Sequence, residues 1–334
     1  MSAPSRGRRA PLPEPASARV REDRARLASA WERFWFEPRS LAPLVLVRVV
    51  LGLVVAIWGV SLLPDATSFL GPDGVLPDIP EVRARVGLLQ VFTGDLAALL
   101  VVGALIPAGL AIAVGWRTRW ATILAFVLLL SVSRRNPWIL NSGDALLRHA
   151  VLFLAMTPAG AALSVDRWRT HRDRFWTVPV AAPWGLRLIQ LQVSTMYLFS
   201  VFEKVRGDAW TDGTALADVW RIGDVARYTM PLALHDSLLV ANLLTLGTLA
   251  IELALAVLIW NRAARPYVVT AGVLLHLGIE ITMAVGFFST VAVTLYLSFT
   301  SPDTAERWIA WVRGRLARAR WQPARRLARM GPAR

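Results

Sequence analysis

Long apolar segments recur along this chain, and they leave few folds open to it. Most of them are about 19 to 24 residues long and nearly free of charge, so each would span the ~30 Å hydrocarbon core of a bilayer as a helix. Only 18% of the 334 residues are charged, which is low for soluble domains. The sequence therefore predicts an all-α, polytopic integral membrane helix bundle, with candidate spans at residues 42–63, 96–114, 116–132, 145–163, 184–202, 237–260, 267–285 and 287–299.

The number of crossings follows from charge as well as from length. Residues 116–132 and 287–299 each hold only about 13 uninterrupted apolar residues, which keeps seven crossings as an alternative to eight. The segments 1–39 and 301–334 contain nine arginines each, and arginine-rich segments remain in the cytoplasm. Two cytoplasmic termini require an even number of crossings. We therefore predict about eight transmembrane helices in the plasma membrane, with both termini inside the cell.

The chain is predicted to divide into three parts. Residues 1–40 form a cytoplasmic basic tail with an interfacial helix, residues 41–300 form the transmembrane domain, and residues 301–334 form a second cytoplasmic, basic, amphipathic tail. Both tails mix arginine with Trp, Leu and Ala at helical spacing, which is typical of helices that lie on a bilayer surface. We expect these tails to bind anionic lipids, and we expect no nucleic-acid partner. No cleavable signal peptide is recognisable before the first apolar segment.

Ionisable side chains inside the predicted spans need a partner, a water-filled cavity or a function, because each costs ~2.5 to 3.5 kcal/mol at the centre of a span. Arg48 and Arg187 lie near the cytoplasmic ends of their helices, where long side chains reach the interface, and we interpret them as structural. Glu252 lies deeper in its span. We expect it to pair with Arg148 or with another residue of the bundle.

A dense polar cluster at residues 141–144 (NSGD) precedes the fourth span, and Arg148 and His149 follow one turn later. One interpretation is helix capping, since Asn141 or Asp144 can accept hydrogen bonds from the first free amides of the helix, and Asp144 shares a face with Arg148. The other interpretation is that these side chains line a polar pocket together with the outer end of the fifth span. The sequence leaves both open.

His276 and Glu280 in the seventh span are four residues apart and therefore lie on one helical face. They are interpreted as a buried polar pair, as an acid–base dyad, or as part of a metal site to which His149 would add a ligand. Zinc and iron sites need at least three protein ligands, so we predict no metal site. Because the chain has no cysteine, disulfides and thiolate chemistry are excluded.

Lys204 is the single lysine among 37 lysines and arginines, and it ends an apolar helix at the predicted outer side of the membrane. Arginine anchors a helix end equally well, but only lysine can lose its proton at accessible pH. A partly buried lysine is therefore a candidate general base, whereas an arginine-rich composition would also leave an occasional lysine without a role. Both explanations stay open, and Glu203 or Asp144 is the group expected to tune the charge of Lys204.

The segment 185–210, GLRLIQLQVSTMYLFSVFEKVRGDAW, resembles the Q…Y…K…W…G segment of the vitamin K-dependent gamma-carboxylase and of the related horizontally transferred transmembrane (HTTM) domains of bacteria. Further similarity lies in RVVLGLVVAIW at 48–58, FLGPDGVLP at 69–77, NSGDALLRHAVLFLAMTPAGAALSVD at 141–166 and HLGIEITMAVGFFS at 276–289. The resemblance covers roughly residues 40–300. It therefore implies that the predicted domain 41–300 is an HTTM/carboxylase-like transmembrane domain.

The resemblance also implies a site and a cofactor. Lys204 stands where the carboxylase has the lysine thought to deprotonate reduced vitamin K, and His276 aligns with a histidine of the family's late membrane segment, so both are predicted to be catalytic. The family's chemistry consumes oxygen, yields the quinone epoxide and occurs on the lumenal side, which is equivalent to the bacterial exterior. The predicted pocket for a quinone, reduced vitamin K or menaquinol, is lined by Asn141, Asp144, His149, Gln192, Tyr197, Glu203, Trp210 and Glu280.

Two departures restrict what carries over from the family. The carboxylase has an asparagine–histidine pair before its fourth span, whereas this chain has no histidine there before His149. The carboxylase also has a large lumenal domain that binds its substrate, and here the basic segment 301–334 follows the last predicted span. Glutamate carboxylation is therefore not the default expectation, and whether the chain is an enzyme stays open.

The leading hypothesis is quinol-dependent oxygenation, or a carboxylase-like modification of an exported peptide, at an outward-facing lysine pocket. A transporter or permease is the first alternative, because buried charges also mark ion and solute paths. A non-catalytic export or assembly factor is the second, with the predicted outward loop 205–236 as its docking surface.

Overall fold

The computed structural model describes residues 16–77, 87–229, 231 and 236–329. This part of the chain is α-helical apart from one short pair of strands, in which β1 (Arg39–Ser40) runs antiparallel to β2 (Val180–Ala181). The α-helices are α1 (Ala16–Phe36), α2 (Ala42–Leu62), α3 (Ala66–Leu70), α4 (Asp95–Val114), α5 (Thr118–Arg135), α6 (Ser142–Ala155), α7 (Val165–Thr170), α8 (Trp184–Lys204), α9 (Asp208–Thr211), α10 (Ala215–Trp220), α12 (Leu238–Val257), α13 (Arg265–Thr282), α14 (Phe288–Tyr296) and α15 (Pro302–Arg329). Among the short 3-10 turns, η5 (Leu258–Trp260) follows α12 and η6 (Leu297–Phe299) follows α14. The predicted all-α fold is confirmed.

A helix lies at each of the eight predicted spans. Within the described ranges, three helical segments are long and apolar enough to cross a bilayer: Ala42–Leu70, Asp95–Val114 and Leu238–Trp260. The segment Phe288–Phe299 is apolar but shorter. Helices α1 and α15 cover most of the two tails, where interfacial helices were expected. The total of eight crossings and the position of the terminal helices on a bilayer surface stay predictions.

The fourth predicted span differs most from its helix. The sequence predicts a span over residues 145–163, whereas α6 ends at Ala155. Arg48 of α2 donates hydrogen bonds to three carbonyl oxygens of the irregular chain that follows, those of Ala159, Ala162 and Leu163 at 3.0, 3.0 and 2.6 Å. Arg48 is completely buried, so its guanidinium group does not extend into solvent at the end of its helix. Its role is structural, because it supplies hydrogen-bond donors to backbone carbonyl groups of the non-helical chain that follows α6.

Glycines let α2 and α4 approach closely. A Cβ atom added to Gly52 would lie 2.4 Å from the backbone nitrogen of Ala113, and one added to Gly109 would lie 2.5 Å from that of Ala56. Small residues at such contacts are typical of helix pairs in membranes. From this pair the core continues through α5 and α6 to α14, α8, α12 and α13.

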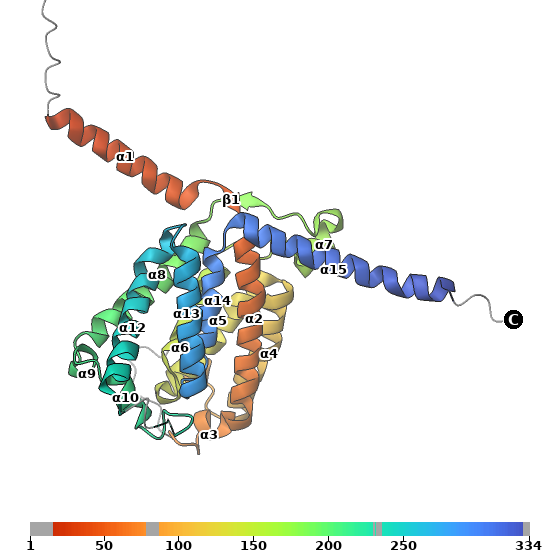
Figure 1. Ribbon diagram of the computed structural model, residues 1–334. Helices are drawn as coiled ribbons and strands as arrows, with labels where there is room; N and C mark the ends of the chain where they lie inside the picture. Colours follow the sequence, from red (N-terminus) through yellow and green to blue (C-terminus); the bar gives the residue numbers. More distant parts are fainter. Residues whose placement is uncertain (1–15, 78–86, 230, 232–235, 330–334) are drawn as a thin grey trace, which may run out of the picture.

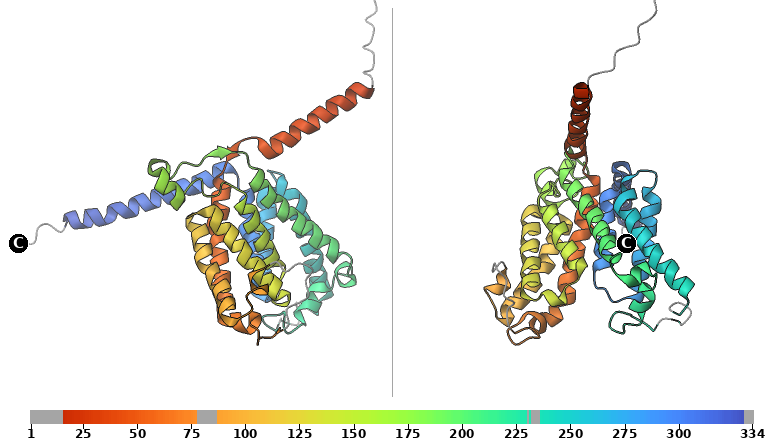
Figure 2. Two further views of the ribbon diagram at one scale, coloured as in Figure 1. Left: turned by 180° about the vertical axis from the view of Figure 1, so that it is seen from behind. Right: turned by 90° about the vertical axis from the view of Figure 1, so that its left-hand side faces the viewer.

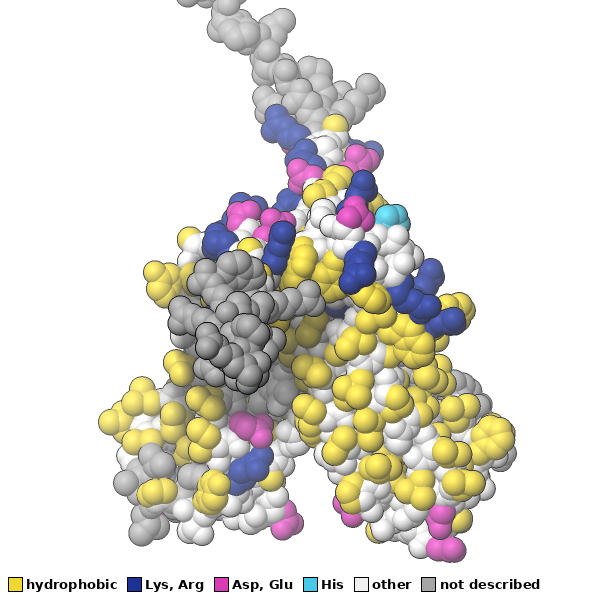
Figure 3. Space-filling model, turned by 90° about the vertical axis from the view of Figure 1, so that its right-hand side faces the viewer, with side chains coloured by type: hydrophobic (Ala, Val, Ile, Leu, Met, Phe, Trp, Pro, Cys, Tyr) yellow, Lys and Arg dark blue, Asp and Glu magenta, His cyan; other side chains and the backbone are white. Residues whose placement is uncertain are grey.

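The terminal helices leave the same end of the bundle, and α3, α9 and α10 lie at the other end (Figure 1). Figure 2 shows α2, α4 and α5 on one side of the bundle and α12 and α13 on the other. Hydrophobic side chains cover much of the lateral face in Figure 3, while Lys and Arg side chains gather toward the end that carries α1. Large apolar side chains are exposed along the outer helices, among them Ile57 (55%), Leu100 (62%), Phe199 (61%), Leu243 (65%) and Leu274 (61%). This apolar belt beside an arginine-rich end is the surface that a protein presents to a bilayer.

Candidate functional site

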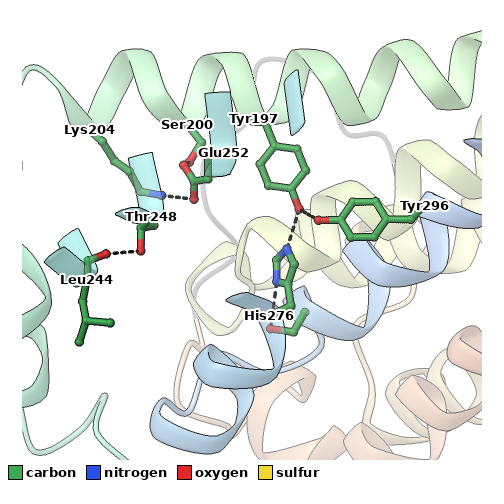
Figure 4. Close-up of polar contacts among 9 residues, drawn as sticks. Tyr197, Ser200, Lys204, Leu244, Thr248, Glu252, His276 and Tyr296 are labelled. Carbon is green, nitrogen blue, oxygen red and sulfur yellow. Dashed lines mark hydrogen bonds and ion pairs between the residues drawn. The ribbon is translucent and has the colours of Figure 1, made fainter. Parts of the chain in front are cut away.

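Lys204 ends α8 and forms an ion pair with Glu252 of α12 (Figure 4). The hydroxyl of Ser200, one helical turn before Lys204, donates a hydrogen bond to the same carboxylate at 3.1 Å. The Glu252 side chain is 5% exposed and the Lys204 side chain is 21% exposed. The ammonium group also lies 4.8 Å from the ring centre of Trp210 in α9. A buried carboxylate and an aromatic face therefore hold the lysine in place.

A second polar group lies two turns before Lys204 on α8. The Tyr197 hydroxyl forms hydrogen bonds with Nε2 of His276 from α13, at 2.5 Å, and with the hydroxyl of Tyr296 from α14 (Figure 4). The other ring nitrogen of His276, Nδ1, lies 3.3 Å from the hydroxyl of Ser289 at the start of α14. All four side chains belong to buried residues. Three helices therefore converge on one connected chain of hydroxyl and imidazole groups.

Helix α8 presents a member of each group from one face, because Tyr197, Ser200 and Lys204 are spaced three and four residues apart. Buried polar groups need partners, and here α12, α13 and α14 supply them. The arrangement joins an ion pair with partial access to solvent and a deeper chain of hydrogen-bonded groups along the same helix. Groups of these kinds can accept, hold or pass on a proton.

The cluster at residues 141–144 forms a capping box at the start of α6. The Asn141 side-chain oxygen accepts hydrogen bonds from two amides of the first turn at 2.7 and 3.3 Å, and the Asp144 carboxylate accepts one from the Asn141 amide at 2.8 Å. Asp144 also accepts a hydrogen bond from the Trp58 indole at 2.6 Å, and the Asn141 amide group donates to the Val285 carbonyl at 3.0 Å. The capping interpretation is confirmed. The hydrogen bonds described for this cluster serve capping and helix packing, and none of them reaches the ion pair on α8.

Glu280 and His276 do not form the polar pair that their positions on one helical face suggested. Its carboxylate pairs with Arg227 at 2.8 Å, and its side chain is 39% exposed. His149 is exposed on α6 and is not part of the chain around His276. Within the described part of the molecule, no three His, Asp or Glu side chains converge as metal ligands would. His276 and Glu280 therefore make separate contacts, which corrects the interpretation of the two as a pair.

Neither Glu203 nor Asp144 compensates the charge of Lys204. The Glu203 side chain is 49% exposed, and its carboxylate lies 3.4 Å from the guanidinium group of Arg206, two residues past the end of α8. The compensating carboxylate is instead Glu252, since α12 packs along α8 and places this side chain against the last turns of α8. This corrects the expected tuning group from Glu203 or Asp144 to Glu252. The residue of the bundle that pairs with Glu252 is Lys204.

The remaining polar side chains predicted for the pocket or for helix ends have structural partners. Arg148 donates a hydrogen bond to a serine hydroxyl of α5 and does not pair with Glu252. Gln192 donates to the Leu146 carbonyl at 2.9 Å and so joins α8 to α6. Arg187 stacks on the Phe34 ring, with 4.6 Å from its guanidinium carbon to the ring centre. The pocket role predicted for Gln192 stays a prediction.

Sequence reasoning missed three members of the site, Ser200, Ser289 and Tyr296. Serine in an apolar helix gives little signal, because it often bonds to the backbone of its own helix. Tyrosine gives more, since the chain has only four and two of them, Tyr197 and Tyr296, are bonded to each other here. A scarce polar aromatic residue inside an apolar segment is therefore the feature that would have pointed to Tyr296.

Fold and site together define an all-helical membrane protein with connected polar groups buried between its helices. The model of the HTTM domain family matches residues 36–304, and the chain belongs to this family. Its relation to the vitamin K-dependent gamma-carboxylase is what membership of the family implies. No curated protein and no solved structure matches the chain. The resemblance to HTTM domains seen in the sequence is thereby confirmed.

Proposed function

We propose that the chain is a multi-pass protein of the plasma membrane with both termini in the cytoplasm. The helices at all eight predicted spans support this number of crossings. The gathering of arginines at one end, from which both terminal helices leave, supports this orientation (Figures 1 and 3). In this orientation Lys204, at the far end of α8, faces the exterior.

The function that the site supports best is the binding and deprotonation of a hydroquinone-type lipid, reduced vitamin K or menaquinol. One observation carries the proposal: the only lysine of the chain, which stands on the same helix as Tyr197, is paired with a buried carboxylate of the neighbouring helix α12. A hydroquinone needs an acceptor for its hydroxyl proton, an aromatic face for its ring and access from outside. The Glu252 carboxylate, the Trp210 ring and the partial exposure of Lys204 fit these three needs.

The hydrogen bonding of the ion pair favours Glu252, rather than Lys204 itself, as the group that takes the proton. In the ion pair Lys204 donates to Glu252, so the group with free lone pairs is the carboxylate. We therefore assign proton acceptance to the pair: the hydroxyl proton passes to Glu252, and the Lys204 ammonium then stabilises the oxyanion that remains. The pair gains one positive charge as the substrate gains one negative charge.

A bound hydroquinone would supply the oxygen-dependent epoxide chemistry that the family resemblance implies. The buried chain of Tyr197, His276 and Tyr296 has a supporting role in this proposal. It fixes the α8 face on which Lys204 stands, because two of its hydrogen bonds tie that face to α13 and α14. His276 is thus assigned to positioning.

Replacement of the lysine tests the proposal. Lys204→Ala and Lys204→Arg are expected to abolish quinol consumption by the chain reconstituted in vesicles that contain menaquinol, without preventing membrane insertion. Glu252→Gln is expected to lose activity as well, because an amide cannot take the proton. Arg206→Gln, at an exposed position two residues past the end of α8, is the matched control and should keep full activity. Unchanged turnover in either Lys204 variant contradicts the assignment, as does an unmodified chain that consumes no quinol.

A further inference from the structure

A cavity of about 840 Å³ lies at the end of the bundle opposite to Lys204. Its walls come from β1, the start of α15, the first turns of α8 and α13, and η6. Figure 1 shows these segments at the end from which both terminal helices leave. The proposed quinol chemistry makes no use of this cavity.

Positive charge dominates the cavity. It is lined by four arginines and two carboxylates: Arg39, Arg187, Arg262, Arg265, Glu37 and Asp303. Glu37 is paired with Arg39 at 2.8 Å. The hydrogen bond from Arg39 lowers the pKa of the Glu37 carboxyl, and the charges of Arg33 and Arg187 lower it further. The lining therefore keeps an excess of positive charge.

Two of the guanidinium groups are held in place by uncharged partners. Arg265 donates to three carbonyl oxygens, those of Ile259, Phe299 and Trp260 at 2.8, 3.0 and 3.3 Å. Arg187 donates to the Gln190 side chain at 2.8 Å and to a carbonyl of α1 at 3.2 Å. A guanidinium group has five N–H donors, so each of the two keeps donors for a further acceptor.

No carboxylate of the described ranges forms an ion pair with Arg187, Arg262 or Arg265. Their charges are therefore available to an anion in the cavity. Fixed guanidinium groups with unused donors are the usual recognition elements for phosphate oxygens.

The cavity also has apolar lining, and an exposed apolar surface begins beside it. Apolar lining is provided by Leu186, Val269, Phe299 and Trp308. The outer surface of α13 begins beside the cavity and carries an exposed apolar stripe, with Tyr267, Leu274, Leu277 and Ile281 more than half exposed. These positions are seven, three and four residues apart, so they follow one side of the helix. A ligand with a charged head and an apolar tail matches both surfaces.

We propose that this cavity binds the phosphate headgroup of an anionic membrane phospholipid, whose acyl chains lie along the exposed stripe of α13. A free phosphate ion would use the arginines alone and would leave the apolar wall and stripe without a partner. The site also differs from general attraction between the basic tails and the bilayer, because it has a defined cavity and guanidinium groups held by backbone carbonyls.

Native mass spectrometry of the full-length chain in detergent tests this proposal, with phosphatidylglycerol and phosphatidylcholine offered in equal amounts. Removal of an arginine near a lipid headgroup is expected to weaken binding about fivefold, corresponding to ~1 kcal/mol per charge. Arg262→Gln should therefore lower the affinity for phosphatidylglycerol about fivefold, and Arg187→Gln with Arg262→Gln about 25-fold. Binding of phosphatidylcholine should stay unchanged.

The control is Arg169→Gln, an exposed arginine of α7 that lies outside the cavity lining. It should bind phosphatidylglycerol as the unmodified chain does, and all variants should keep the far-ultraviolet circular dichroism of a folded bundle. Equal loss in the control and the cavity variants overturns the proposal, because binding would then follow total charge. Displacement of phosphatidylglycerol by excess inorganic phosphate also overturns it, since the cavity would then be a site for the free ion.

Discussion

Separate and joint replacement of Lys204 and Glu252 should reveal how strongly the ion pair couples α8 to α12. Lys204→Met leaves the Glu252 carboxylate, 5% exposed, with Ser200 as its remaining described donor. Breaking a buried pair in this way costs ~3 to 5 kcal/mol. Because the lysine side chain is 21% exposed, we expect the lower end of that range, ~3 kcal/mol.

The reverse change should cost less. Glu252→Gln leaves an ammonium group that reaches solvent and faces the Trp210 ring, so we expect a loss of ~1 to 2 kcal/mol. The double variant has no unpaired charge and should lose less than Lys204→Met alone. The two changes should therefore be coupled by ~2 kcal/mol.

The free energy of unfolding can be measured by titrating the detergent-solubilised chain with dodecyl sulfate and following the circular dichroism of its helices. Arg206→Gln removes the exposed ion pair between Arg206, just past the end of α8, and Glu203. These side chains are 64% and 49% exposed, so the loss should be less than ~1 kcal/mol. If the double variant loses the sum of the two single losses, Lys204 and Glu252 do not interact, and the ion pair cannot be the basis of the site.

Two further stability predictions concern the packing of α2. Gly109→Ala should destabilise the chain by ~1 to 3 kcal/mol, because its Cβ atom would lie 2.5 Å from the backbone of Ala56. The control is Gly247→Ala, which has open space around it and should be neutral or stabilising. Equal shifts of the melting temperature in the two variants would refute the close approach of α2 and α4. Arg48→Met should cost at least ~3 kcal/mol, because it leaves three carbonyl groups without their donor. In thermal unfolding monitored by size-exclusion chromatography, a melting point equal to that of Arg169→Gln would refute this role of Arg48.

Helix positions could be predicted because their signal is local. The length of a span follows from bilayer thickness, and hydropathy is read from consecutive residues, so a helix was found at every predicted span. The error at residues 145–163 has a local and a tertiary cause, and the local one is Pro158, which lacks the N–H that would continue α6 beyond Ala155. The apolar run continues past Ala155, but Arg48 from another helix supplies donors that let the chain leave the helix there.

The site was predictable only as a set of candidates. Lys204, Tyr197 and His276 could be identified because each is an unusual side chain in an apolar helix or matches a family motif. Their partners depend on which helix faces meet, and the lysine and its carboxylate are separated by 48 positions in the sequence. Shared spacing also misled, since Glu280 lies on the same helix as His276 but pairs with Arg227 beyond the helix end.

The distance in sequence between interacting residues explains why the capping interpretation was right and the charge-tuning interpretation was wrong. Capping is decided within four residues, and Asn141 with Asp144 forms the expected box. Compensation of a buried charge is decided by the nearest facing helix, which for the last turn of α8 is α12. Candidate sites in helix bundles are therefore better derived from helix neighbours than from spacing along one helix.

The Lys204→Arg variant separates a structural role from a chemical one. Arginine keeps the positive charge, can pair with Glu252 and can face the Trp210 ring, so a purely structural role predicts normal stability and normal turnover. In the proposed chemistry the ammonium must stabilise an oxyanion at one point, and a planar guanidinium group distributes its charge over a larger fork. We therefore expect this variant to be as stable as the Arg206→Gln control and yet to consume no quinol. A stable Lys204→Arg variant with full turnover would leave the single lysine without a chemical role.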